Sequence, residues 1–594
     1  MTASNYKLAN AARQELKRQT MRQDILFSDA QDALDKLLDA PSPATLIQSF
    51  PDQDLYYLMH KIGVHDFTPV LALATSKQWE YILDVEVWDD DRLNTAMMTQ
   101  VFSQLFKADP QRLLRWAITQ KPGFFEYYLY HNISVVIREH DEPPPSDFED
   151  YITLDDKFYF RFPDKAEENN FDSDILPEDA EQTALQDSML NDEAPELIET
   201  MLKTLAQMDL SVFHGLMLET PALLPAEIEE EEFRQKNIRL AEKGFLPPHE
   251  AVGIYQPVGP LNKLRKRPSA GRGDASKIDP NIPLPPVFFT QFIQGEYLFA
   301  QALHQVQAEG RVQDLESEFA ALLNKIISAD RIKIRNRETI QKTMDKALSF
   351  LSLGLEVLLD ASEPSLEQAV DLIGKHFLED IFRTGSREGI KLRSRAKAWY
   401  DNSFLKGKNL PLSFLGETYL GVMGGLMIPR PMFFANYADK DLYRHFKSLK
   451  DIQATNRLLS EIIALDNFLN TLAVDTGQFT LGVLTYKSMI LTFWTRYQMG
   501  LDSITTPSLS PIPFEAFKEF FKGLFDGDTA ISDTREQDLA RWAAIACGHP
   551  DEDLPVPLQK VLYSLLREVE AEYGHVSPSQ LDPRFMPLFL LTQG

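Results

Sequence analysis

Short apolar stripes with helical spacing, separated by proline and glycine, constrain the fold of this chain more than any other feature. Residues 55–62 carry apolar side chains at positions i, i+3, i+4 and i+7, between Pro51 and Gly63. Residues 98–106 repeat this pattern before Pro110. A helix this short cannot bury its stripe alone, so neighbouring helices must stack. We therefore expect an all-α, multi-helical fold built from irregular, α-solenoid-like helical hairpins.

Further helix signals support this expectation. Thr75 and Gln78 have the spacing of a capping box, and residues 124–137 predict another helix. Towards the C-terminus, residues 458–472 carry Leu and Ile at intervals of four and three, which is typical of tightly paired helices and favours a partner within the same chain. Glycines within the apolar run 419–429 indicate close backbone packing or a helix break rather than a phosphate-binding loop.

Changes in composition divide the chain into six parts. Residues 151–162 alternate apolar and polar side chains about an Asp-Asp pair, which predicts a small β-hairpin. The acidic run 164–199 is expected to be a loop or linker, with a polyanion mimic or a docking segment for a basic partner as the alternative. The predicted parts are a polar arm (1–25), a helical array (26–138), an acidic linker containing the hairpin (139–198), a central helical segment (199–261), a basic, proline-rich linker (262–286) and a C-terminal helical domain (287–594).

The stretch 229–260 joins the two halves and carries dense local signals. It predicts a charged helix with four glutamates in its first turn and an apolar stripe formed by Phe233, Ile238, Leu240 and Ala241. Gly244 suits the left-handed position beyond a helix end, and a second short helix is expected from Pro248. The glutamates are interpreted as a solvated helix start rather than a cation site, because consecutive helical side chains point about 100° apart.

Composition limits the classes of function. A net charge of −28 disfavours nonspecific binding to nucleic acid or to anionic membranes. The single cysteine, Cys547, excludes an internal disulfide and fits a reducing compartment. Neither a secretory signal nor a bilayer-spanning apolar run is evident, so we expect a cytoplasmic protein.

No catalytic, cofactor-binding or metal-binding motif is found in the sequence. His60 and His65 are badly spaced for a shared metal, and the acids at 89–91 are interpreted as a helix cap and loop. Cys547 and His549 are the right residue types for a nucleophilic site, but the segment is better interpreted as a helix end. Walker-type and Rossmann-type glycine patterns are absent. We predict no cofactor and assign no catalytic residue.

Two basic clusters stand out in so acidic a chain, at residues 263–272 and 383–397. In the second cluster, residues at i, i+4 and i+8 would share one helix face. This face could dock the acidic run, bind a protein partner, lie solvated, or contact nucleic acid, the last being disfavoured by the overall charge. The possible interaction face consists of Arg383, Arg387, Lys391, Arg393, Arg395 and Lys397.

Several longer segments carry a family resemblance. They are residues 37–63, 78–88, 108–116, 153–162, 229–260 and 376–385. Through them the chain resembles a family of bacterial proteins catalogued only as a domain of unknown function, from residue 37 to about residue 591. This resemblance implies no activity and no site residues. Residues 46–130 are also similar to the superhelical repeats of magnesium-transporter cytoplasmic domains and flagellar motor switch proteins.

From these observations we expect a protein-interaction or regulatory scaffold that binds protein partners. Two alternatives stay open. One is an enzyme whose site is assembled from scattered residues, and the other is a nucleic-acid-associated protein that uses the two basic clusters. A cleft with convergent polar side chains would favour the enzyme, and a broad apolar groove would favour the scaffold.

Overall fold

The computed structural model divides the chain into two compact units. The N-terminal unit comprises Met1–Ile254, Pro268–Gly295 and Val306–Ala347, and the C-terminal unit comprises Tyr255–Arg267, Glu296–Gln305 and Leu348–Gly594. The structure describes residues 17–138, 150–163, 178–256, 258, 264–267, 297–306, 309–333, 337–361, 364–438, 441–472, 484–504, 507–526, 530–550 and 553–592.

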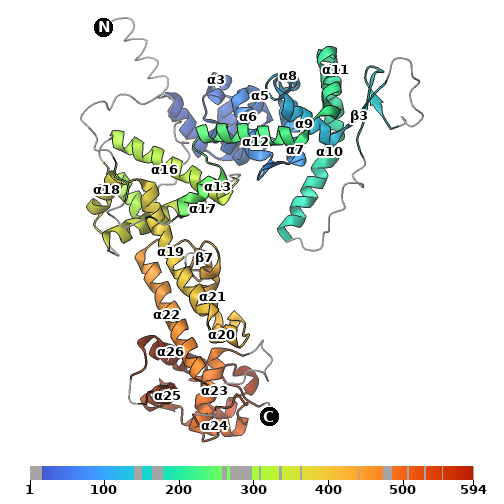
Figure 1. The fold of residues 1–594 in the computed structure, drawn as a ribbon. Coiled ribbons are helices and arrows are strands. Elements are labelled where there is room, and N and C mark those ends of the chain that lie inside the picture. The colour runs from blue at the N-terminus through green and yellow to red at the C-terminus, as the bar shows by residue number, and fades with distance from the viewer. Residues whose placement is uncertain are drawn as a thin grey trace. The chain divides into compact units, whose positions relative to one another are not determined.

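The N-terminal unit begins with a series of short helices, which confirms the predicted helical array (Figure 1). These are α2 (Ala30–Leu38), α3 (Pro43–Gln48), α4 (Asp52–Ile62), α5 (Thr68–Leu73), α6 (Ser76–Glu86), α7 (Thr95–Ala108), α8 (Pro110–Gln120) and α9 (Pro122–Asn132). Helix α6 starts with the predicted capping box, in which Thr75 and Gln78 each accept a backbone N–H from the other. Proline in the first turn of α3, α5, α8 and α9 sets where these helices begin.

Each of these helices packs on its neighbours in the series. Helix α4 contacts α2 and α6, and α7 contacts α5, α6 and α8. Aromatic side chains fill the space between them: Trp79 meets Trp116 edge to face at 5.9 Å, and Phe102 meets Tyr128 at 5.0 Å. The buried Trp79 indole N–H donates to the Leu71 carbonyl at 2.9 Å. The stacking expected from the short apolar stripes is therefore present.

Small antiparallel sheets interrupt the helices. A tight pair, β1 (Trp88–Asp89) and β2 (Arg92–Leu93), precedes α7. The predicted hairpin is present as β4 (Ile152–Thr153) and β5 (Phe158–Arg161), but it is extended by β3 (Ser134–Ile137) in the order β3-β5-β4. The prediction of helix for residues 124–137 is wrong beyond Asn132, because the β-branched run in β3 pairs along β5.

The rest of the N-terminal unit is helical. It contains α10 (Glu178–Met208), α11 (Leu210–Glu219), the 3-10 turn η2 (Thr220–Ala222), α12 (Pro225–Glu242), α13 (Pro248–Ala251), η3 (Val252–Tyr255, whose last residue lies in the other unit), α16 (Glu309–Asp330) and the start of α17 (Arg337–Leu359). Helix α10 begins inside the acidic run that was expected to be a loop or linker. Its later part buries Ala194, Ile198, Met201 and Leu202 and packs on α7, so apolar burial outweighs charge density there.

The C-terminal unit contains longer helices and two further strand pairs. In chain order these are α15 (Leu298–His304), the remainder of α17, α18 (Leu366–Lys375), α19 (Leu378–Asp401), α20 (Phe404–Gly407), η5 (Leu412–Leu415), α21 (Gly416–Met427), β6 (Phe433–Phe434), β7 (Tyr443–Arg444), α22 (Leu449–Thr471), α23 (Tyr486–Gln498), α24 (Phe514–Lys522), β8 (Phe525–Asp526), β9 (Ala530–Ile531), α25 (Asp533–Ala546), α26 (Val556–Tyr573), η6 (Pro578–Gln580) and η7 (Pro583–Phe585).

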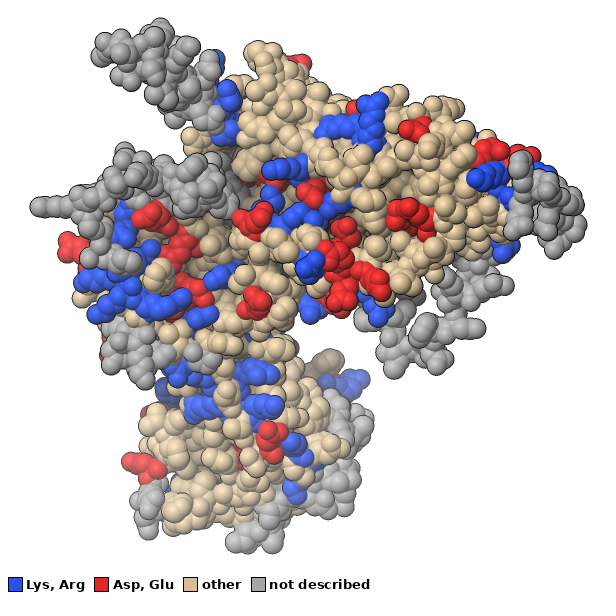
Figure 2. All heavy atoms as spheres, turned by 45° about the horizontal axis from the view of Figure 1, so that its top comes forward, with Lys and Arg blue, Asp and Glu red and all other residues tan. Residues whose placement is uncertain are grey.

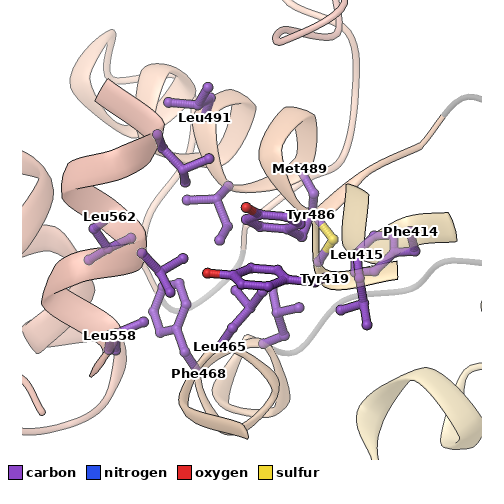
Figure 3. Close-up of a cluster of buried hydrophobic side chains, with 14 of the residues drawn as sticks. Phe414, Leu415, Tyr419, Leu465, Phe468, Tyr486, Met489, Leu491, Leu558 and Leu562 are labelled. Atoms are coloured by element: carbon purple, nitrogen blue, oxygen red, sulfur yellow. The ribbon is translucent and has the colours of Figure 1, made fainter. Parts of the chain in front are cut away.

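Helix α22 carries the predicted apolar seam, and its partners lie within the same unit. It packs against α19, α21 and α26, and Ile462, Leu465 and Leu469 are fully buried. Figure 3 shows the core formed there, where Tyr419 of α21 lies against Tyr486 of α23, with ring centroids 5.8 Å apart. The prediction that this seam packs against a partner within the same chain is thus confirmed.

The glycines of α21 serve close packing within a continuous helix. A Cβ atom at Gly421 would lie 2.4 Å from the Phe434 ring, and one at Gly425 would lie 2.6 Å from the Met432 carbonyl oxygen. Strands β6 and β7 therefore lie directly against the helix backbone. Of the two expectations for this run, close backbone packing is confirmed.

Candidate functional site

Helix α12 differs from its sequence-based prediction in a way that matters for function. It begins at Pro225, so the four glutamates do not lie in its first turn. Glu229 accepts the Leu93 N–H at 2.7 Å, whereas Glu231 pairs with Arg234 on the surface. These carboxylates point apart, as the helical spacing required.

The predicted apolar stripe on α12 is only half present. Phe233 and Leu240 are half-buried, whereas Ile238 and Ala241 are exposed. Lys236 is the one buried side chain of this helix, all of whose residues the structure describes. A lysine inside a protein is costly unless its charge finds a partner.

The end of α12 was predicted correctly: Gly244 has φ of +83° and α13 begins at Pro248.

Lys236 lies at the wall of a cavity of about 470 Å³ in the N-terminal unit. Apolar side chains form much of this wall, with a few polar groups among them. The lining residues are Gln53, Tyr56, Tyr81, Asp84, Val85, Trp88, Asp89, Asp90, Phe233, Lys236, Asn237, Leu240, Phe245, Leu246, Pro248, Ile327, Ser328, Arg331, Ile332 and Lys333. Size and lining are typical of a site for a small organic molecule.

Two aromatic rings surround the Lys236 ammonium group. Its Nζ lies 4.4 Å from the Trp88 ring centroid and 4.7 Å from that of Phe233, and it donates weakly to the Asp90 carbonyl at 3.5 Å. Cation–π attraction partly replaces lost hydration. Burial nevertheless dominates and lowers the pKa of Lys236 to about 8, although the charges of Asp84 and Asp90 oppose that change.

An ion-pair network fixes α12 beside α6. The Arg239 guanidinium donates to both oxygens of the buried Asp84 carboxylate, at 2.7 and 2.8 Å. The pKa of Asp84 is raised because burial outweighs this pairing. Lys121 bridges Glu80 of α6 at 2.8 Å and Glu232 of α12 at 3.6 Å. The network holds Lys236 at the cavity wall.

Two of the loop acids at 89–91, Asp89 and Asp90, line the cavity, and the expected cap role falls to Asn94, the N-cap of α7. Asp90, at the turn between β1 and β2, has φ of +56° and pairs with Arg331 at 2.6 Å. Asp89 accepts from Asn94 at 2.8 Å and pairs with Lys333 at 3.4 Å. These contacts bring the end of α16 to the mouth of the cavity.

His60 and His65 do not form a metal site. His60 Nε2 lies 2.9 Å from Glu86 Oε1, and the same oxygen accepts the Tyr56 hydroxyl. In the described part of the chain, no cluster of three or more His, Cys, Asp or Glu side chains is arranged to hold a metal ion.

Cys547 lies at the end of α25, where Gly548 takes the left-handed conformation with φ of +78°. Burial raises the pKa of the Cys547 thiol, which opposes formation of a thiolate nucleophile. The interpretation of this segment as a helix end is confirmed.

The basic residues at 383–397 all lie on α19, and most contact groups of their own unit. Arg383 pairs with Glu379, Lys391 with Glu388, and Arg395 donates to Asn456 and Ser460. Arg387 donates to the Val258 carbonyl. From the first basic cluster, Arg265 forms a bidentate pair with Asp380. Figure 2 shows basic and acidic side chains close together over part of the visible face, and a region where basic side chains predominate.

A second hollow of about 570 Å³ lies in the N-terminal unit between α8, the end of α10 and the start of α11. Arg115, Thr119, Gln207 and Asp209 line it together with Ile118, Leu205, Met208 and Val212. We regard the Lys236 cavity as the stronger candidate, because a buried lysine with a lowered pKa lies at its wall.

Comparison with known proteins identifies the family of this chain. The model of a family described as "Family of unknown function (DUF6178)" matches residues 10–592. The chain belongs to this family. Neither a curated protein nor a solved structure matches this DUF6178 member. Its resemblance to magnesium-transporter and flagellar motor switch repeats therefore stays a prediction. Within the described residues, none of the helices is long and apolar enough to cross a bilayer.

Sequence reasoning missed the cavity because its wall comes from distant parts of the chain. Tyr56, Trp88, Phe233 and Ile332 are far apart in sequence, and no motif joins them. One local signal was available: Lys236 lies three residues after Phe233 on the same helix face.

Proposed function

We propose that this protein is a cytoplasmic regulatory scaffold whose N-terminal unit binds a small organic ligand in the Lys236 cavity. The observation that carries the proposal is a lysine that is only 8% exposed at the wall of a 470 Å³ cavity and forms no salt bridge with any described residue. Such a group is costly to maintain for stability alone, and buried groups with a shifted pKa concentrate at functional sites.

The surroundings of the cavity support a binding role. Its walls are held by the Asp84–Arg239 pair and by the Glu80–Lys121 pair, so the site is formed before any ligand arrives. Preformed, largely apolar cavities with few polar groups are the usual sites for small molecules. The scaffold part of the proposal rests on the many helices and on exposed basic positions of α19, such as Lys391 and Lys397.

The enzyme alternative draws on the same amine. A lysine with a pKa of about 8 can exchange a proton near neutral pH, as a general acid or base must. Tyr56, which lines the cavity, donates its hydroxyl to the Glu86 carboxylate, but the described residues include no metal cluster there, so support for chemistry is weaker than support for binding. Conversion of a bound compound during incubation, rather than its simple retention, would favour this alternative.

The nucleic-acid alternative has less support. Glu379 and Glu388 neutralise Arg383 and Lys391, and Arg387 and Arg395 are held by neutral groups of their own unit, which reduces the charge that this face offers to phosphates. Replacing Lys391 and Lys397 by Glu tests the partner role of this face, because both side chains are exposed. Loss of specific co-purifying proteins would support the scaffold, and loss of bound nucleic acid would support the alternative.

Native mass spectrometry tests the proposed ligand directly. Protein purified from its own cells without denaturation should carry a small-molecule adduct that is released on unfolding. Ser328→Trp, at a half-buried lining position, fills the cavity and should abolish the adduct. An adduct retained equally by Ser328→Trp, or a complete absence of any bound compound, would contradict the proposal.

A further inference from the structure

The charges around the Lys236 cavity indicate which charge its ligand should carry. Three basic side chains line the cavity: Lys236, Arg331 and Lys333. Arg331 is paired with Asp90 at 2.6 Å and Lys333 with Asp89 at 3.4 Å. The third lining acid, Asp84, is paired with Arg239 at 2.7 Å.

Once these pairs are set aside, one lining charge remains. Among the described residues, no carboxylate oxygen lies within 4.0 Å of the Lys236 Nζ, and its contacts are two aromatic rings and one carbonyl oxygen. A buried ammonium group with a single weak acceptor has unused donor capacity. One negative group on a ligand would supply the missing partner and neutralise the site.

The walls specify the rest of the ligand. Trp88 and Phe233 flank the ammonium group, with rings 5.6 Å apart and tilted by 55°. Leu240, Leu246 and Ile332 complete an apolar surface beside them. A flat apolar body would displace water from these side chains, while its polar end reached Lys236.

We propose that the cavity binds small amphipathic anions, each with one negative group held by Lys236 and a flat apolar body packed against Trp88, Phe233 and Leu240. This inference rests on the proposed ligand-binding function and adds the chemical class of the ligand. Dianions and cations are disfavoured, because the remaining basic and acidic side chains already neutralise one another.

Anion binding should weaken as the pH rises above about 8. The charges nearest the ammonium group are Asp84 on α6, Asp90 and Asp91 on the β1–β2 turn, and Lys333 after α16, and the pKa of Lys236 among them is about 8. A bound anion favours the charged lysine and raises that pKa. Affinity is therefore constant below pH 8 and falls above it, by up to tenfold per pH unit.

Two matched fluorescent probes test the inference on the full-length protein. 8-Anilinonaphthalene-1-sulfonate carries one negative charge at all the pH values used, and N-phenyl-1-naphthylamine has the same apolar body without the charge. Titration at pH 7 should show at least tenfold tighter binding of the anionic probe. Its affinity should fall between pH 8 and pH 9, whereas the affinity of the neutral probe should not change.

Three variants separate the possible outcomes. Lys236→Met keeps the length of the side chain without its charge, and should weaken the anionic probe at least tenfold while retaining the neutral probe. Lys107→Met removes an exposed lysine of the same unit and should change neither probe. Ser328→Trp should weaken both probes, and circular dichroism confirms that each variant is folded.

The outcomes distinguish failure of this inference from failure of the proposed function. Equal binding of both probes, unaffected by Lys236→Met but lost in Ser328→Trp, would overturn the anion inference and leave the ligand cavity standing. Probe binding that Ser328→Trp does not alter would overturn the cavity itself, and the anion inference with it.

Discussion

Replacing Gly385 by alanine should destabilise the C-terminal unit strongly, because α17 and α19 meet there backbone to backbone. A Cβ atom at Gly385 would lie 2.0 Å from the Phe350 carbonyl oxygen and 2.8 Å from the Gly354 nitrogen. The contact is reciprocal, since a Cβ atom at Gly354 would lie 2.1 Å from the Ile381 carbonyl oxygen. Backbone atoms cannot rotate away as a side chain can.

The magnitude follows from this geometry. An ordinary Cβ contact begins near 3.4 Å, so the two helices would have to separate by roughly 1.4 Å at a fully buried crossing. Overpacking of a core costs about 1–3 kcal/mol or more. Alanine recovers about 1 kcal/mol of intrinsic helix propensity relative to glycine. Because the overlap is large and involves backbone atoms on both helices, we take the upper end of that cost, about 3 kcal/mol, and expect a net loss of about 2 kcal/mol of local stability.

Hydrogen exchange measured by mass spectrometry is the suitable assay, because a chain of two units need not unfold in one step. Peptides from α17 and α19 should exchange about 30-fold faster or more in Gly385→Ala, which corresponds to about 2 kcal/mol. Gly374→Ala is the matched control, since no atom lies within 4 Å of its added Cβ. Unchanged protection of α19 in Gly385→Ala, or equal losses in both variants, would refute the argument.

Three further perturbations test other parts of the structure. Arg239→Met should cost about 3–5 kcal/mol, because it leaves Asp84 buried and unpaired. The folded-state pKa of Asp84 lies above its unfolded value, so protonation favours the folded state, and the loss measured by hydrogen exchange in peptides of α6 and α12 should shrink as pH falls from 7 towards 5. Thr75→Ala removes the cap of α6 and should lower local stability by about 1 kcal/mol, measured by hydrogen exchange in peptides of α6. Cys547 should react with iodoacetamide more slowly at pH 7.5 than a cysteine in a short peptide, because burial raises its pKa; mass spectrometry gives the rate.

Local signals predicted much of the fold. The capping box at Thr75, the end of α12 at Gly244 and the restart at Pro248 are all present as predicted, because each depends on a few adjacent residues. Residues 134–137 were assigned to a helix wrongly, because their strand conformation depends on pairing with β5. Propensity alone does not reveal such a partner.

The candidate site, like strand β3, depends on residues that are distant in sequence. Sequence reasoning ranked the basic residues of α19 first, and the structure gives most of them partners within their own unit. It overlooked Lys236, whose ammonium group is covered by Phe233 of the same helix and by Trp88 and Asp90 from a distant part of the chain. The sequence of a charged helix predicts that its lysines are exposed, and only the residues packed against the helix show that one of them is buried.

The sequence by itself determined the class of this protein: a helical chain with small sheets, a single cysteine and a family relationship that extends over nearly all of its length. These properties depend on the period of apolar residues and on capping and breaking residues, which act over a few positions. The tertiary structure alone decided which side chains became buried together, including the lysine at the cavity wall and the glycine crossing of α17 and α19. Burial is set by surfaces that meet from distant parts of the chain, and no local pattern records where they meet.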